Sequence, residues 1–349
     1  TNHKDRLLYP MKRDPKDRGK DKWERMSWDE AIDLVAGKLI EIRDKYGAET
    51  VIFGQGTGRD ISSWITRLAW SYGSPNYTCF ALSGLACYLP RVAGMAATCG
   101  GYTVADCSQQ FPDRYDNPNW RCPELMVLWG NYPLRANSDG FYGHWMIDLM
   151  KRGMKIMMVD PRVTWLSLKA EAHLRLRPGT DAALALGMMN VIINEDLYDH
   201  DFVEKWTYGF DELAERVQEY PPSKVAEITW VPEEEIKSAA RMLASAKPAA
   251  MQWGLAVDMV KEALPAGQAI VGLFQITGNV DVPGGNIFPV ELIAYSGGWG
   301  GELISEEQKA KRIGLVNEVY AAEELLNKAV EMAKSFTANA PIAVKYAKA

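Results

Sequence analysis

Several features that would assign the sequence to a particular class of protein are missing from its 349 residues. The five cysteines form no Cys-x-x-Cys pair, which argues against a zinc ribbon and against an iron–sulfur cluster held by this chain alone. An odd number of cysteines in a long chain does not suggest a disulfide scaffold. No apolar run reaches about 18 residues, the length that suggests a membrane span. The net charge of −6 gives no reason to expect a nucleic-acid partner.

The start of the sequence also lacks recognisable signals. It begins at Thr1 without methionine and has no signal-peptide pattern. We therefore interpret the sequence as a mature form or an excised piece, and its localisation cannot be predicted from it.

The most informative feature that is present is a repeated one. Four apolar segments of strand length each run into a turn of Gly, Asp, Asn or Pro, at residues 50–56, 125–131, 156–162 and 249–254. Helical patterns lie between them, and this alternation predicts an α/β fold with mainly parallel sheets and crossover helices. Ligands bind such sheets outside the carboxyl ends of the strands, where glycine lets the backbone approach closely. The sequence therefore predicts a site for a large, phosphorylated cofactor.

Helix signals fill the intervals between these segments. Ser27 and Glu30 form a capping-box pattern that predicts a helix to about Lys45. Further helices are expected over residues 60–72, 139–151, 181–194, 200–247 and 262–276. Residues 73–123 are rich in Gly, Pro, Cys and aromatic residues, and a connection of this length in a compact domain is usually functional.

The composition changes near residue 300. All Trp, Cys and His residues precede Gly300, and a glycine cluster at residues 297–301 lies at the change. This pattern favours a domain boundary or a fusion point. We expect three regions: an N-terminal arm and helix (1–46), a cofactor-binding α/β region (47–298) and a helical tail (301–349).

Six short motifs, taken together and in order, carry a resemblance to a known family. They lie at residues 7–13, 22–31, 129–131, 159–162, 177–181 and 275–279. Residues 1 to about 298 resemble the molybdopterin oxidoreductases of the dimethyl sulfoxide reductase family. The segment 111–118 is similar to the catechol dehydroxylase and acetylene hydratase side of that family.

The resemblance implies a cofactor, a reaction class and a partner. The cofactor is molybdopterin guanine dinucleotide, two copies of which hold molybdenum or tungsten. The reaction is reductive dehydroxylation or related two-electron chemistry on a small organic substrate, with an iron–sulfur electron-transfer subunit as a possible partner. Family members also carry a [4Fe–4S] cluster, whose ligands are absent here, and a C-terminal domain that is not found, so we expect a chain truncated at both ends. Members are cytoplasmic or exported.

The resemblance also implies roles for individual residues in cofactor binding. Asn131 is expected to contact phosphate, and Asp160 and Asp181 to accept hydrogen bonds from ribose hydroxyls or guanine. An equally good interpretation of Asp181 is a helix N-cap. The alternative for Gly54, Gly56 and Gly58 is an ordinary tight turn. The expected cofactor-binding residues are Gly54, Gly56, Gly58, Trp129, Gly130, Asn131, Asp160, Arg162, Gly179, Thr180, Asp181, Gly254, Thr277 and Asn279.

Two residues are expected to have roles in catalysis. Cys87 falls where the family places the thiolate ligand of the metal, with Cys79 as the second choice and a buried thiol as the alternative. His144 is either a core histidine or a proton donor near the substrate. Arg162 is readable as a phosphate ligand or as one member of a surface ion pair.

The tail resembles a second family. Residues 301–305, 313–319 and 339–345 are similar to the C-terminal part of crotonase-fold enoyl-CoA hydratases, whose catalytic residues are not found here. We therefore expect a helical tail without a role in the active site, joined as a chimera. The alternatives to a molybdopterin enzyme are an incomplete chain without activity and an enoyl-CoA hydratase or isomerase fragment.

Overall fold

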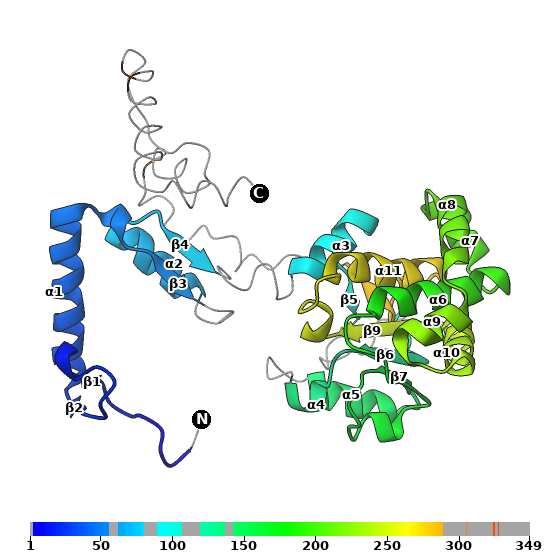
Figure 1. Cartoon of the computed structure of the whole chain (residues 1–349), viewed down its shortest axis with the longest axis horizontal. Helices are drawn as coiled ribbons and strands as arrows, with labels where there is room; N and C mark the ends of the chain where they lie inside the picture. The colour runs from blue at the N-terminus through cyan, green and yellow to red at the C-terminus, as the bar shows by residue number, and fades with distance from the viewer. Residues whose placement is uncertain are drawn as a thin grey trace. The chain divides into compact units, whose positions relative to one another are not determined.

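A computed structural model describes residues 3–55, 62–79, 89–106, 119–136 and 142–288, together with Ser305, Glu324 and Asn327. The chain divides into two compact units (Figure 1), one formed by residues 1–81 and 292–349 and the other by Leu82–Glu291. We call them the N-terminal unit and the sheet unit. Gly56, Gly58, Cys87, the segment 111–118 and nearly all of the tail lie outside the described residues.

The N-terminal unit contains one long helix and two small sheets. Ser27 and Glu30 exchange hydrogen bonds as a capping box in front of α1 (Trp28–Tyr46), which confirms the predicted helix start. The other elements of this unit are β1 (Met11–Lys12), η1 (Pro15–Asp17), β2 (Glu24–Arg25), η2 (Ala48–Thr50), β3 (Phe53–Gln55), α2 (Ser62–Tyr72) and β4 (Tyr77–Cys79). The pair β1–β2 is antiparallel and the pair β3–β4 is parallel.

The first of the four predicted strands forms, but it does not join the other three. It is β3, which pairs with β4 in a separate two-stranded sheet. Gly54 lies within β3 and not after it. An apolar run of strand length does not identify its pairing partner, so the sequence could not separate this strand from the others.

The sheet unit is built on four parallel strands in the order β8-β7-β6-β9. They are β6 (Leu125–Trp129), β7 (Lys155–Val159), β8 (Ala172–Leu174) and β9 (Ala249–Trp253). Trp129, at the end of β6, lies beside Val159 of β7 and Trp253 of β9. The predicted parallel sheet is confirmed. The carboxyl ends of the strands that precede Gly130, Asp160 and Gly254 lie side by side, and we call this side of the sheet its carboxyl edge.

Helices cover both faces of this sheet (Figure 1). They are α3 (Leu89–Cys99), α4 (Pro133–Ala136), α5 (Tyr142–Lys151), α6 (Asp181–Asn194), α7 (His200–Trp206), α8 (Phe210–Arg216), α9 (Pro222–Thr229), α10 (Glu233–Ser245) and α11 (Ala263–Ile276). Short 3₁₀ turns are η5 (Ser167–Lys169), η6 (Val217–Glu219) and η7 (Leu255–Val257), and β5 (Val104–Ala105) pairs with β10 (Asn286–Ile287).

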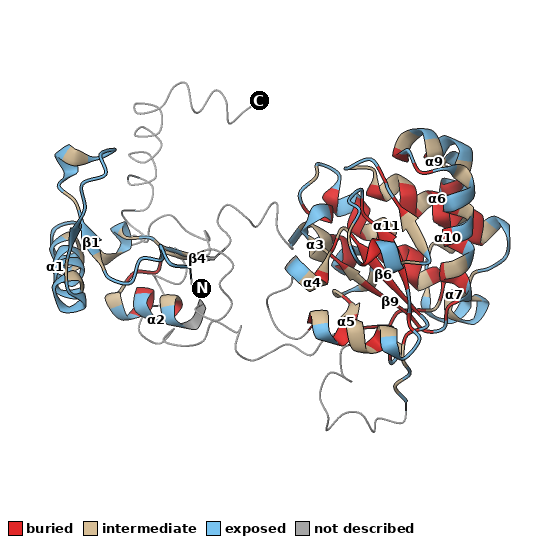
Figure 2. Ribbon diagram, turned by 90° about the horizontal axis from the view of Figure 1, so that it is seen from below, coloured by how far each residue is buried: buried red, intermediate tan, exposed pale blue. Residues whose placement is uncertain are grey.

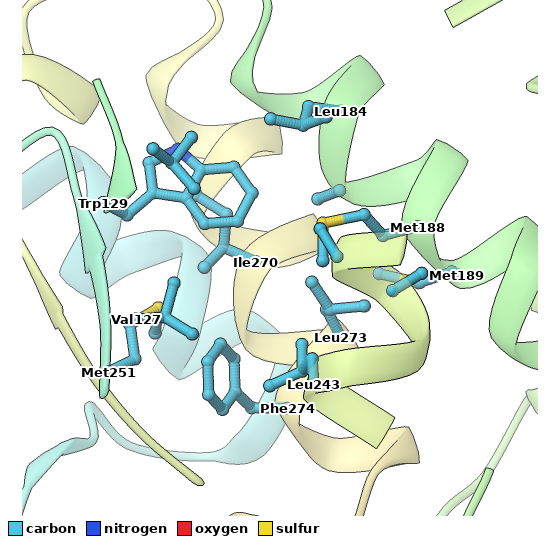
Figure 3. Close-up of a cluster of buried hydrophobic side chains, with 14 of the residues drawn as sticks. Val127, Trp129, Leu184, Met188, Met189, Leu243, Met251, Ile270, Leu273 and Phe274 are labelled. Atoms are coloured by element: carbon cyan, nitrogen blue, oxygen red, sulfur yellow. The ribbon is translucent and has the colours of Figure 1, made fainter. Parts of the chain in front are cut away.

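The core follows the alternation of side chains along the strands. Val127 and Trp129 face a cluster with side chains of α6, α10 and α11 (Figure 3), whereas Met126 and Leu128 face α5. Every residue of β6 is buried, as expected for the inner strand of a sheet covered on both faces. Figure 2 shows the resulting buried layer through the sheet unit.

Among the helices that the structure describes, none combines the length and apolarity needed to cross a membrane.

Candidate functional site

The strand order of the sheet creates a switch point between β6 and β9. The chain passes from β6 to β7 and β8 on one side, then returns to place β9 on the other side of β6. The connections that leave the carboxyl ends of β6 and β9 therefore diverge, and in parallel α/β sheets ligands bind at such a point. Residues 130–132 and 254–258 are the two connections, and we call them the switch-point loops.

Two glycines allow these loops to lie in contact. The N–H of Gly254 donates to the carbonyl of Trp129 at 2.9 Å, and the N–H of Gly130 donates to that of Val159 at 2.8 Å. A Cβ at Gly254 would lie 2.2 Å from the carbonyl oxygen of Gly130. Gly130 has a φ of +60°, which disfavours other residues. Both predicted glycines are therefore required by the backbone at this edge.

Asn131 is the polar side chain held inside the switch-point loops. It is only 9% exposed. Within the described ranges, its side-chain amide makes no hydrogen bond. The backbone N–H groups of Asn131, Tyr132, Leu255 and Ala256 likewise have no acceptor among the described residues. Leu255 and Ala256 are exposed and begin η7, and the first N–H groups of a helical turn have no partner within it. These N–H groups and the Asn131 amide together form a set of donors suited to an anionic ligand.

Asp181 and Trp129 form one buried unit beside the loops. The indole Nε1–H of Trp129 donates to the carboxylate of Asp181 at 2.8 Å. Burial raises the pKa of Asp181, and the hydrogen bond from Trp129 partly offsets that rise. Asp181 is the first residue of α6, and the N-cap is Thr180, so the N-cap interpretation of Asp181 was wrong. Thr180 makes no side-chain cap bond, and its hydroxyl donates to the carbonyl of Arg177.

Asp160 and Arg162 form an ion pair after β7. The guanidinium of Arg162 donates to both carboxylate oxygens of Asp160, at 3.0 and 2.7 Å, and its backbone N–H donates at 2.9 Å. The side chain of Asp160 is buried, whereas that of Arg162 is 60% exposed. The hydrogen bond from Arg162 to Asp160 raises the pKa of the guanidinium. Arg162 was interpreted as a phosphate ligand or as one member of an ion pair, and the structure contains the ion pair.

Thr277 and Asn279 lie at the opposite edge of the sheet. Asn279 accepts from the backbone N–H of Ala249, the first residue of β9, and donates to the hydroxyl of Thr277. Both side chains are fully buried and use their polar groups inside the protein. They therefore lie at the other end of the strands from Gly130 and Gly254, and their role in cofactor binding stays a prediction.

The other predicted residues are placed less decisively. His144 is exposed in the first turn of α5, which excludes a core histidine and leaves the proton-donor role a prediction. Cys79 ends β4 in the N-terminal unit. Gly179, with a φ of +86°, and Thr180 line a groove of about 1430 Å³ between α3, α6, α7, α8 and α11. The walls of this groove are mainly apolar.

Two residues that the sequence did not indicate also belong to this edge. Asp258 ends the second switch-point loop, and Arg91 of α3 contacts it. A polar residue shortly after a strand end was the available signal for Asp258, whereas nothing in the local sequence indicated Arg91. In the part of the chain that the structure describes, no group of three or more His, Cys, Asp or Glu residues could hold a metal ion.

Comparison with known proteins gives one consistent result. The family model described as "Molybdopterin oxidoreductase" matches residues 6–345. Acetylene hydratase of Syntrophotalea acetylenica is 38% identical over 327 residues, which cover 89% of this chain and 41% of that protein. Formate dehydrogenase H of Escherichia coli (strain K12) is 34% identical over 289 residues, covering 82% and 38%.

A solved structure agrees with these sequence matches. Acetylene hydratase from Pelobacter acetylenicus superposes with a TM-score of 0.66 and 36% identity, covering 88% of this chain and 41% of that one. The chain thus spans about two fifths of the length of these relatives. The family match extends to residue 345, so it includes most of the tail and leaves the crotonase resemblance and the chimera hypothesis without support.

Proposed function

Because the chain belongs to the molybdopterin oxidoreductase family, we propose that the switch-point loops bind the guanine nucleotide end of a molybdopterin cofactor. The observation that carries the proposal is the side-chain amide of Asn131, a residue only 9% exposed, which makes no hydrogen bond within the described residues. A pyrophosphate offers anionic oxygens to this amide and to the backbone N–H groups of Leu255 and Ala256. The donor set of the loops therefore fits the group that the family requires.

The acceptors beside the loops suit the rest of a nucleotide. Asp181 is held in place by Trp129 and retains a second carboxylate oxygen, which can accept from a ribose hydroxyl or a guanine N–H. The carboxylate of Asp160 is already engaged by Arg162, so a ligand at Asp160 must share that ion pair. Asp181 is therefore our first choice for nucleotide recognition, and Asp160 the second.

We further propose that the chain is part of a molybdenum or tungsten enzyme that acts on a small organic molecule. The bound metal would supply two-electron chemistry, such as reductive dehydroxylation, or activation of a small molecule for hydration. Similarity to an acetylene hydratase and to a formate dehydrogenase supports a small substrate. An iron–sulfur electron-transfer subunit remains the proposed partner.

Guanosine diphosphate tests the nucleotide site without requiring the metal. We expect it to bind the purified chain in isothermal titration calorimetry, and Asn131→Ala to raise its Kd about 10- to 100-fold, as for losing hydrogen bonds to a charged group. Asn194→Ala is the matched control, because Asn194 is exposed at the end of α6. Failure of the unaltered chain to bind would favour the alternative of an incomplete, inactive chain.

Cys87 is proposed as the metal ligand and is tested separately. In metal-loaded protein, Cys87→Ala should remove one sulfur contact from the X-ray absorption spectrum while pterin content stays unchanged, because the nucleotide supplies most of the binding contacts. Cys79→Ala tests the second choice in the same way, and Cys122→Ala, which replaces a free cysteine, is the control. Identical sulfur coordination in Cys87→Ala would exclude Cys87.

Deleting residues 301–349 tests the tail. We expect unchanged affinity for guanosine diphosphate, because all the predicted cofactor-binding residues lie before the deleted segment. Enoyl-CoA hydratase activity that disappears with the deletion would instead support the crotonase alternative.

A further inference from the structure

One arginine side chain holds both ends of the second switch-point loop. Nη1 of Arg91 donates to the carbonyl oxygen of Trp253 at 2.9 Å, where β9 ends. The Nε of Arg91 lies 3.3 Å from Oδ2 of Asp258, and its backbone N–H donates to Oδ1 at 3.1 Å. The loop between these two attachment points carries the N–H groups of Leu255 and Ala256.

The Arg91–Asp258 pair is unusually buried. Its side chains are 13% and 0% exposed, whereas every other ion pair among the described residues has at least one partner exposed by more than a quarter. Oδ2 of Asp258 is also buried without a well-aligned hydrogen bond. Buried ion pairs often stabilise a fold no better than apolar residues of similar size. A contribution to the stability of the fold therefore explains this ion pair poorly, whereas holding the second switch-point loop in one position explains it well.

The backbone that carries Arg91 is itself firmly held. A Cβ at Gly94 would lie 2.6 Å from the carbonyl oxygen of Leu264, and one at Gly267 would lie 3.0 Å from Cα of Arg91. Helices α3 and α11 are thus in backbone contact at Arg91. The arginine extends from a rigid helix pair to a short loop, which is the geometry of a fixed support.

We propose that Arg91 and Asp258 are positioning residues that hold the second switch-point loop in the conformation that binds a pyrophosphate. This inference rests on the nucleotide site proposed above. The two residues act through the backbone of residues 254–257 and do not themselves contact the ligand. Their role is separable from folding, because the loop is short and its other bonds are local.

Two variants test this role. Arg91→Lys keeps the charge but cannot reach Trp253 and Asp258 with the same planar group. Arg91→Met combined with Asp258→Leu removes both charges, so no buried carboxylate is left unpaired. Arg241→Lys is the matched control, because Arg241 makes a two-bond pair with Glu195 on the surface.

Three measurements are made on each variant: affinity for guanosine diphosphate, global unfolding in urea, and hydrogen exchange of the Val257 and Asp258 amides. These amides donate within the loop to Gly254 and Leu255 and therefore report its conformation. We expect both test variants to bind about tenfold more weakly and to exchange about tenfold faster, as for one lost hydrogen bond. The double variant should keep the unfolding midpoint of the unaltered chain, and Arg241→Lys should change neither affinity nor exchange.

Unchanged exchange at Val257 and Asp258 in both test variants would overturn the inference. So would faster exchange accompanied by unchanged affinity. If the unaltered chain bound no guanosine diphosphate, the proposed function would fail, and the exchange rates would still decide whether Arg91 positions the loop.

Discussion

Replacing Trp129 by phenylalanine measures the hydrogen bond that fixes Asp181. The change removes the indole N–H that donates to the carboxylate at 2.8 Å and replaces the indole by a smaller aromatic ring. Hydrogen bonds to charged groups contribute about 1.5–3 kcal/mol net to stability, and more is lost when the charged partner stays buried. Trp145→Phe is a matched control, because Trp145 is also buried but its indole nitrogen has no hydrogen-bond partner.

The two variants lose similar volume, so the difference in their free energies of unfolding isolates the hydrogen bond. We expect Trp129→Phe to be less stable than Trp145→Phe by about 2 kcal/mol at pH 7. Urea unfolding followed by circular dichroism measures this difference. Equal stability of the two variants would refute the assignment of the Trp129–Asp181 bond as a stabilising contact.

The pH dependence of that difference gives a second test. Burial raises the pKa of Asp181 above its ordinary value of 3.8, and Trp129→Phe should raise it further because the hydrogen bond from Trp129 lowers it. A carboxyl group with a raised pKa in the folded state is stabilising when protonated and loses that contribution as pH rises through the raised pKa. The deficit of Trp129→Phe relative to Trp145→Phe should therefore shrink from pH 7 towards pH 4. A deficit that grows on acidification would contradict this sign.

Three shorter predictions concern other contacts. Gly254→Ala places a Cβ 2.2 Å from the carbonyl oxygen of Gly130 and should abolish guanosine diphosphate binding. In the control Gly272→Ala, in the middle of α11, the new Cβ meets only Met189, at 3.4 Å, so binding should be unchanged and the free energy of unfolding should rise by up to about 1 kcal/mol. Calorimetry measures the binding and urea unfolding measures the stability. Arg162→Gln should lower the free energy of unfolding in urea by about 1–3 kcal/mol, because it leaves the buried Asp160 carboxylate without its ion pair. An unchanged free energy of unfolding would show that the ion pair does not stabilise the fold. Hydrogen bonds from Ser27 lower the pKa of Glu30, so α1 should lose protection from amide exchange as pH falls through that pKa; this acid sensitivity should vanish in Ser27→Ala.

The parts of the fold that could be predicted from sequence depend on local pattern. The alternation of buried strands and helices predicted the parallel sheet, and Gly130, Asp160 and Gly254 follow its strands as expected. The capping box before α1 and the helix that begins at Asp181 were also predictable, because these signals lie within a few residues. The pairing of β3 with β4 was not, since strand patterns carry no information about partners.

The candidate site shows the same division. The role of Asn131 was predicted from the family resemblance of residues 129–131, whereas the unpartnered state of its amide required coordinates. Asn279 follows a similar glycine-containing pattern but bonds to the amino end of β9, so polarity near glycine did not distinguish the two edges. Arg91 and Asp258 lie 167 residues apart in sequence, and only tertiary packing of α3 against α11 brings them together.

The strand order has a consequence for when the site can form during synthesis. Strand β9 lies beside β6 although more than a hundred residues separate them in the chain, and β7, β8 and the helices α4 to α10 of the intervening segment are made first. The two switch-point loops therefore meet only after the last strand of the sheet has been made and has paired. A growing or partly folded chain presents one loop without the other and has no complete set of donors. If the proposed nucleotide site is correct, only chains that have finished building this sheet can bind the cofactor there, and cofactor insertion would also act as a check on folding.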